Sequence, residues 1–185
     1  TDLPQRVFLD EDSRVDAVLV EARERHRAGQ PVLVGTQSVA ESEHYAKVLA
    51  EAGIEAHVLN ARNDAREAAV IAEAGEYGAV TISTQMSGRG TDIRLGGIDE
   101  HDHRRVARSG GLAVLQIGRY PSGRLDAQLR GRSGRQGDPG TTATFVSTTD
   151  ELVQANAPDH LLEKIRRRGS QLDQTTLGSI IDQAQ

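Results

Sequence analysis

The sequence predicts an α/β protein in which helices cover both faces of a parallel β-sheet. Short apolar segments alternate with helix-like segments along most of the 185 residues. The apolar segments are nearly continuous, as in Val32-Leu-Val-Gly35, and this is typical of strands buried on both faces. Because helices separate the strands, we expect parallel crossover connections. Sheets of this kind bind ligands at the carboxyl ends of their strands.

Each predicted element has its own start and stop signals. The first helix, 13–27, follows capping candidates at Asp10 to Ser13 and ends at Gly29. The second begins at Ser38 with Glu41 three residues later, which is a capping-box pattern, and runs to Gly53. The other predicted helices are 64–74, 124–132, 158–168 and 176–183, and the predicted strands are 31–35, 57–59, 79–83, 111–117 and 142–147.

One connection is unusually long. The 27 positions between Ser83 and Gly111 exceed a plain connection between strand and helix. We therefore expect a functional loop with an insertion. The loops that follow strands 79–83 and 111–117 should both lie at the carboxyl ends of the strands.

Composition excludes several classes of protein. Hydrophobic residues make up 37% and charged residues 26%, which is typical of folded globular chains. No apolar run reaches the roughly 20 residues of a membrane-spanning helix, and no secretory signal is recognisable. The absence of cysteine excludes a disulfide scaffold and a thiolate metal site, and it fits a reducing cytosol. Since the chain begins with Thr1, we expect a domain of a longer protein.

The charge is unevenly distributed. The formal net charge is −5, yet residues 104–135 contain eight arginines and one acid, Asp126. Arginine presents a planar fork that matches phosphate or carboxylate, so this window predicts an anion site. The alternative is a solvated face that pairs with the acidic remainder of the chain.

The strongest motif runs from Gln128 to Asp138. Gln128, Arg132 and Arg135 are spaced by four and then three residues, which places them on one face of a helix. Gly131 and Gly134 each cost about 1 kcal/mol within a helix, so they indicate close backbone approach or a break at the helix end. Adjacent arginines repel unless an anion lies between them, and a transferring phosphoryl group is such an anion. The alternative is a salt-bridged surface helix.

A second motif, 84–92, follows strand 79–83 directly. Gly88 and Gly90 flank Arg89, so the backbone amides can turn toward an anion. Asp92 could then bond a ribose hydroxyl or a metal-bound water. A plain tight turn is the alternative. The interpretation as an anion-binding loop gains weight because this loop and the arginine motif are both expected at the carboxyl ends of the strands.

Together these segments resemble the second nucleotide-binding domain of the SecA family, whose members are ATP-driven preprotein translocase motors. The resemblance covers residues 1–155, and the stretch from Asp99 to Val106 is similar to accessory actinobacterial members. It implies a RecA-like helicase C-terminal domain of the P-loop NTPase superfamily over 1–155, with a helical extension over 156–185. The segments that carry it are 32–36, 58–64, 71–97 and 128–140.

The resemblance also implies roles for individual residues. Arg132 and Arg135 would be arginine fingers, and Gln128 would sense the γ-phosphate. Asp92 would contact the nucleotide, and the residues lining the site beside it would be Gly88, Arg89 and Gly90.

The resemblance further implies an incomplete ATP site. The chain has no G-x-x-x-x-G-K-[ST] loop and no Asp-Glu-Ala-Asp run. The groups that hold ATP or ADP and Mg²⁺ are therefore expected on the first nucleotide-binding domain. Alone, the chain should bind nucleotide weakly and hydrolyse essentially none. The implied partners are that domain, a protein-conducting channel and preproteins, at the cytoplasmic face of the cell membrane.

Several alternatives stay open. Residues 116–121 depart from the family's Gly-Thr-x-Arg-His pattern, which leaves the coupling role of this loop unassigned. The second interpretation is that the chain is half of an RNA or DNA helicase, although the low aromatic content and the net negative charge argue against nucleic-acid binding. A non-catalytic interaction module is the third.

Two smaller clusters have competing interpretations. His101 and His103, with Asp99 and Asp102, could bind a metal, but the sequence favours a solvated insertion. The run 166–168 of three arginines could contact anionic lipid or complement the dipole of a helix C-terminus.

Overall fold

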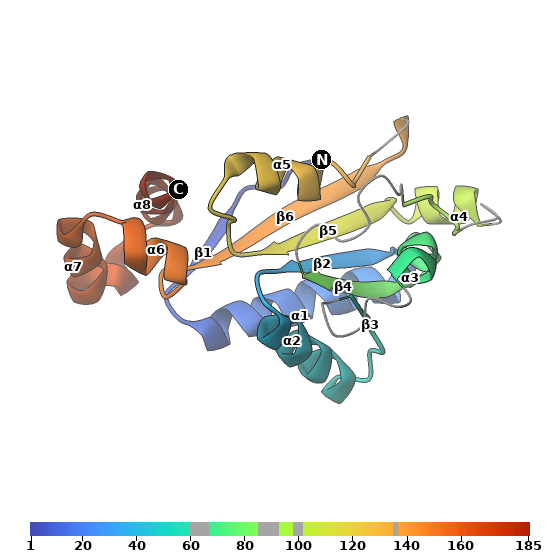
Figure 1. The fold of residues 1–185 in the computed structure, drawn as a ribbon, viewed down its shortest axis with the longest axis horizontal. Helices are drawn as coiled ribbons and strands as arrows, with labels where there is room; N and C mark the ends of the chain where they lie inside the picture. Colours follow the sequence, from blue (N-terminus) through green and yellow to red (C-terminus); the bar gives the residue numbers. More distant parts are fainter. Residues whose placement is uncertain (60–66, 85–92, 98–101, 135–136) are drawn as a thin grey trace.

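Six parallel strands form a single sheet in the order β1-β6-β5-β2-β4-β3 (Figure 1). The computed structural model describes residues 1–59, 67–84, 93–97, 102–134 and 137–185. The α/β fold class predicted from the sequence is confirmed. The strands are β1 (Arg6–Phe8), β2 (Val32–Thr36), β3 (His57–Leu59), β4 (Val80–Thr84), β5 (Leu112–Ile117) and β6 (Gly140–Ser147).

Helices cover both faces of the sheet, as Figure 1 shows for α1 and α2 on one side and α5 on the other. The helices of the sheet layers are α1 (Glu11–Arg27), α2 (Val39–Glu51), α3 (Glu67–Glu73), α4 (His103–Arg108) and α5 (Gly123–Arg130). The chain closes with α6 (Glu151–Asn156), α7 (Asp159–Arg168), the short 3₁₀ helix η3 (Gly169–Gln171) and α8 (Gln174–Ala184).

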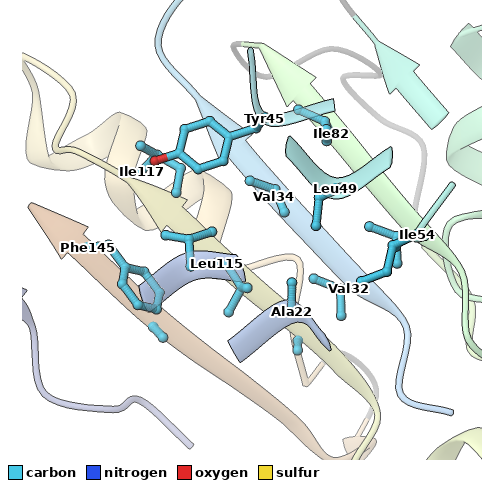
Figure 2. Packing of buried hydrophobic residues seen from close by; sticks show 14 of the residues in the cluster. Ala22, Val32, Val34, Tyr45, Leu49, Ile54, Ile82, Leu115, Ile117 and Phe145 are labelled. Atoms are coloured by element: carbon cyan, nitrogen blue, oxygen red, sulfur yellow. The ribbon is translucent and has the colours of Figure 1, made fainter. Parts of the chain in front are cut away.

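The first face of the sheet packs against α1 and α2. Alternate strand residues such as Val32, Val34 and Leu115 point to this face, where Figure 2 shows them between Ala22 of α1 and Leu49 of α2. All five side chains are fully buried. This core fixes the sheet to the two helices whose N-termini lie at the carboxyl ends of the strands.

The second face packs against α3, α4 and α5. Leu33 and Val114 point to this side and meet Val106 of α4 and Leu129 of α5. A Cβ at Gly35 would collide with Leu129 Cδ2, so the missing side chain lets α5 approach β2 closely. The glycine in the second strand therefore sets the position of the helix that precedes the arginine motif.

A third core joins the C-terminal helices to one side of the sheet. Val7 of β1 and Val146 of β6 pack with Val153 of α6 and with Leu177 and Ile181 of α8. Among the described residues, no helix combines the length and the apolar character that crossing a membrane requires.

The two predicted caps are confirmed. The Asp10 side chain accepts a hydrogen bond from Ser13 N, and Ser38 Oγ accepts one from Glu41 N. In return, the Glu41 carboxylate accepts from Gln37 N, so the reciprocal bond comes from the amide one residue before the N-cap rather than from Ser38 itself. These reciprocal bonds fix the first turn of α2 next to the end of β2.

Four elements were not predicted: the strand β1, the 3₁₀ helix η3, and the helices α4 and α6. The last two are six-residue helices, and α4 lies within the segment predicted to be loop. Strand β1 has three residues and pairs in parallel with β6 far along the chain. Its neighbours extend the pairing, since Leu3 N donates to Thr142 O and the N-terminal ammonium of Thr1 donates to Gly140 O.

Candidate functional site

The arginine motif lies at the amino end of β5, opposite to the expected end of the sheet. Helix α5 runs back from the carboxyl end of β5 along the second face. Ser133 Oγ then donates a hydrogen bond of 2.9 Å to the carbonyl of Leu112, the first residue of β5. The prediction that the arginines lie at the carboxyl ends of the strands is wrong for Arg132, because the helix carries the chain the whole length of the strand.

The helical face predicted for Gln128, Arg132 and Arg135 is not formed. Helix α5 ends at Arg130, and Gly131 is its C-cap. After it, Arg132 N bonds to Leu129 O in a tighter turn, and Gly134 has a φ of 68° that no helix contains. Gly131 and Gly134 thus produce the break at the helix end that the free-energy cost of glycine within a helix predicted. Arg135 lies outside the described residues.

Arg132 is buried although it is charged. It is 8% exposed, whereas Arg124 and Arg130 on α5 are exposed and Gln128 is partly buried. Burying a guanidinium is costly in free energy unless it is paired, so the surrounding structure must stabilise an arginine at a buried position. The turn after α5 therefore presents Arg132 in a fixed place at the amino end of the sheet.

The second motif begins at the carboxyl end of the sheet, but the segment after it reaches the amino end. Thr84 is the last residue of β4, and Gly88, Arg89, Gly90 and Asp92 lie outside the described residues. The segment 93–97 then packs beneath the second face through Ile93 and Leu95. Gly96 N donates to the carbonyl of Gly75, which precedes β4. The turn that carries Arg132 and the segment that follows the Gly-Arg-Gly motif therefore both lie at the amino end of the sheet.

His103 and Asp138 join the two motif regions. His103 Nε2 and Asp138 Oδ1 are 2.9 Å apart, although 35 residues separate them in the sequence. No group of three metal-ligating side chains occurs among the described residues, a set that leaves out two of the four side chains considered as ligands. Asp99 and His101 themselves are not described. Sequence reasoning missed this pair, since it considered the histidine only within its own loop.

The loop after β5, where the sequence departs from the family pattern, is organised by a buried carboxylate. Asp126 of α5 is 2% exposed, and its Oδ1 accepts from Gln116 Nε2 at 2.6 Å and from Tyr120 N at 2.8 Å. Burial, and then the charge of Asp126, raises the pKa of Tyr120 to about 12. Asp126 therefore ties the start of α5 to the loop that precedes it.

A cavity of about 210 Å³ lies beside this carboxylate. Gln116, Arg119 and Asp126 line it together with Asp182 of α8, and Arg119 forms ion pairs with both acids. Arg132 does not line it. The cavity is thus separate from the arginine motif.

A second buried charge lies at the carboxyl ends of the strands. Arg14 of α1 is 2% exposed and contacts Asp150 at 2.7 Å, Glu11 of its own helix, and Glu41 of α2 at 3.9 Å. Burial lowers the pKa of Arg14, but the attraction of Asp150, Tyr45 and the two glutamates outweighs it, so this pKa is raised. Sequence reasoning missed this network, which is independent of the arginine motif.

The two carboxyls that face Arg14 from other elements are harder to ionise than usual. Burial raises the pKa of Asp150, and Arg14 and the Ser147 amide offset it only in part. Burial likewise raises the pKa of Glu41, against the Gln37 amide and Arg14. One guanidinium is shared among three acids. Attraction by these acids therefore has the larger effect on the pKa of Arg14, whereas burial has the larger effect on the pKa of Asp150 and of Glu41.

The fold belongs to the RecA-like class found in helicase C-terminal domains. Domain 2 of the DEAD-box helicase Mss116p, solved bound to an RNA duplex, superposes with a TM-score of 0.59 over 89% of this chain and 60% of that chain. The RNA helicase Prp28 from Chaetomium thermophilum, solved bound to ADP, gives 0.57 over 91% of this chain and 38% of that chain. The sequences are 16% and 20% identical, so this likeness concerns the fold alone.

Sequence comparison identifies the family. A profile described as "SecA P-loop domain" matches residues 1–105 and 98–173. The chain belongs to the SecA family of protein translocase subunits. "Protein translocase subunit SecA 2" of Mycobacterium tuberculosis is 52% identical over 184 residues, which is 100% of this chain and 23% of that protein. The resemblance to accessory actinobacterial SecA is confirmed.

Other relatives agree on the same region. SecA 2 of Thermobifida fusca is 57% identical over 85% of this chain and 21% of its own length. SecA 3 of Mycolicibacterium vanbaalenii is 58% identical over 87% of this chain and 20% of its own length. The chain therefore spans about a fifth of the relatives that it matches.

Proposed function

We propose that this chain is the second motor half of an ATP-driven protein translocase. In this proposal a first nucleotide-binding domain holds ATP and Mg²⁺, and closure of the two RecA-like halves brings Arg132 and Arg135 to the γ-phosphate. Gln128 senses that phosphate, and Asp92 contacts the nucleotide beside Gly88, Arg89 and Gly90. Hydrolysis transfers the γ-phosphoryl group to water, and release of the resulting phosphate removes the anion between the halves and lets them reopen.

The observation that carries this proposal is the burial of Arg132 in a fixed turn. The turn lies at the end of the sheet to which the segment after the Gly-Arg-Gly motif also leads. A charge preorganised in this way stabilises a transferring phosphoryl group without reorganisation during the reaction. Membership of the SecA family supports preprotein export as the work that the motor performs.

The experiment is ATP turnover by the full-length motor with single arginine substitutions. Arg132→Ala and Arg135→Ala should each reduce kcat by roughly 10³- to 10⁵-fold, as arginine fingers do. Arg124→Ala is the matched control, because this arginine of α5 is exposed and should leave kcat within about twofold. A loss below tenfold for both finger variants would contradict the proposal.

Partners and location follow from the same proposal. The motor half works with the first nucleotide-binding domain, a protein-conducting channel and preproteins, and it associates peripherally with the cytoplasmic face of the cell membrane. Anionic lipid is a candidate contact of residues 166–168 at the end of α7, where Arg166 and Arg167 pair with Glu163. We also propose that the motor unit spans 1–155 and that 156–185 forms a helical extension.

Two alternatives are separated by direct measurements. A helicase half would bind RNA or DNA with an affinity that falls steeply with salt, whereas the translocase proposal expects no such binding. A non-catalytic interaction module would give no ATP turnover even when the first nucleotide-binding domain is supplied.

A further inference from the structure

Strand β1 forms one edge of the sheet, because it stands at the end of the strand order and pairs in parallel with β6 (Figure 1). Alternate residues of such a strand turn their backbone groups to opposite sides, so every second residue faces away from the neighbouring strand. In β1 the outward-facing residue is Val7, whose N–H and C=O bond to a side chain of α8. Unpaired groups at an edge are a template for a strand from another chain.

Gln174, the first residue of α8, covers this edge with its side-chain amide. Its Oε1 accepts a hydrogen bond of 2.8 Å from Val7 N, and its Nε2 donates one of 2.9 Å to Val7 O. Two residues that exchange both bonds are characteristic of a hydrogen-bonded pair in an antiparallel sheet. The side-chain amide of Gln174 therefore takes the place of one backbone residue of an antiparallel strand.

Helix α8 is held next to the edge by contacts that do not involve the Gln174 side chain. Asp173 caps the helix by accepting a hydrogen bond from Thr176 N, and Leu177 packs with Val7 in the third core. Val7 is 4% exposed, whereas Gln174 is an exposed residue. Truncating Gln174 should therefore uncover the backbone of Val7 and leave the helix in place.

The rest of β1 has other features that discourage strand addition. The strand is only three residues long, and Pro4 shortly before it has no N–H to donate. Arg6 is exposed, and its guanidinium lies 5.3 Å from the centre of the Phe8 ring. Short length, proline and charge are common means by which proteins protect an edge strand. The cover over the outward-facing residue belongs with these means.

A second copy of this chain fits the covered edge. If two copies met about a two-fold axis, Val7 of each copy would exchange with Val7 of the other the same two bonds that Gln174 makes. Contacts of this symmetric kind are the commonest between identical chains. The two sheets would then join through their β1 strands.

We propose that Gln174 is an edge-blocking residue, whose side-chain amide prevents β1 from pairing in antiparallel fashion with β1 of a second copy. The inference does not depend on the proposed motor function, because it concerns the association of the chain and not the turnover of ATP. Pairing must first break two bonds to Gln174 in each copy, and this competition keeps the copies apart.

The test combines hydrogen exchange with the association state of the chain. Gln174→Ala removes the acceptor of the Val7 amide hydrogen, so this hydrogen should exchange at least about fivefold faster. The dissociation constant of the dimer, from sedimentation equilibrium, should fall at least about tenfold. Gln183→Ala is the matched control and should match the wild type, since this exposed glutamine of α8 bonds to Ser179 of its own helix.

Two further variants separate an open edge from a displaced helix. Gln174→Glu keeps an acceptor for Val7 N and adds a charge at the edge, so it should associate no more than the wild type. If it associates as strongly as Gln174→Ala, displacement of α8 is the cause and the inference is overturned. Gln174→Asn, whose amide is one methylene too short to reach Val7, replaces the alanine variant if that variant does not fold.

The location of the contact provides the last criterion. In Gln174→Ala the amide signals of residues 6–8 should shift as the protein concentration rises, because these residues form the new pair. Concentration-dependent shifts confined to other parts of the chain would overturn the inference. So would an unchanged exchange rate of the Val7 amide or an unchanged dissociation constant.

Discussion

Arg14 Nη1 lies 2.7 Å from Asp150 Oδ1 and joins the first turn of α1 to the residue that precedes α6. The two residues are 136 positions apart, and both sit where the strands end. The contact connects the sheet to the C-terminal helices. The arginine of this ion pair is only 2% exposed.

Removing this arginine should destabilise the fold strongly. Arg14→Met leaves Asp150 and Glu41 partly buried without their cation, and breaking such a pair costs about 3–5 kcal/mol in the free energy of unfolding. Arg167→Met is the control, because its pair with Glu163 on α7 is exposed and contributes under about 1 kcal/mol. Urea denaturation of the 185-residue chain measures both, and equal costs would contradict the prediction.

The Asp150 carboxyl should make stability fall with rising pH. Its folded-state pKa is raised, so the folded state holds this proton more tightly than the unfolded state. The stabilising contribution is complete below the unfolded pKa and is lost as pH rises through the folded pKa. The Asp150→Asn variant does not titrate here. The free energy of unfolding of the wild type, minus that of Asp150→Asn, should therefore decrease as pH rises above the ordinary pKa of 3.8 and stay level once pH has passed the raised folded-state pKa.

Tyr120 should produce a loss of stability in alkali. Its pKa is about 12 in the folded protein against 10.0 ordinarily, so the neutral phenol is favoured by folding. As pH rises from 10 to 12, the unfolded state ionises first and stability falls by on the order of 2 kcal/mol. Tyr120→Phe should remove this component and the part of the 295 nm absorbance change that titrates near pH 12. An unchanged titration would contradict it.

Gly35 should be sensitive to the smallest added side chain. Gly35→Ala places a methyl group against Leu129 and should cost about 1–3 kcal/mol of unfolding free energy by overpacking. Gly123→Ala is the matched control, since a Cβ there meets nothing within 4 Å and alanine favours the helix. Thermal unfolding compares the two, and a neutral Gly35→Ala would show that α5 can move away freely.

The chain should not hydrolyse ATP by itself. It contains the proposed fingers but neither a Gly-Lys-Thr loop nor an Asp-Glu-Ala-Asp run in its sequence. A coupled-enzyme assay should detect no turnover above background, and adding the first nucleotide-binding domain of the same motor should restore a measurable rate. Turnover by the chain alone, with Arg132→Ala as the contamination control, would contradict the division of roles.

Local patterns predicted the elements that local interactions specify. The strand at Val32–Thr36 is a run of apolar residues, and the caps at Asp10 and Ser38 bond within three residues, so both could be recognised from the sequence. The three residues of β1 have no such pattern, because their pairing partner is β6. The end of α5 was placed two residues too late, since the glycine break outweighed the helical spacing of the arginines.

The site was less predictable because its contacts are long-range. The arginine motif was recognisable by composition, but its position at the amino end depends on the path of α5. The bond between His103 and Asp138 spans 35 residues, and no local pattern indicates it. The burial of Arg14 could have been inferred from its spacing. It lies four residues before Val18, which lies four before Ala22, so this charged residue is on the buried face of α1.

The pairing of β1 with β6 has a consequence for how the protein is made. The contact between Thr1 and Gly140 spans 139 residues, so β1 cannot form its hydrogen bonds with β6 until the residues between them have been synthesised. Contacts so distant in sequence slow folding and leave an unpaired strand exposed in the meantime. The nascent chain is thus most vulnerable to aggregation, or most accessible to a chaperone, until the sixth strand has been synthesised.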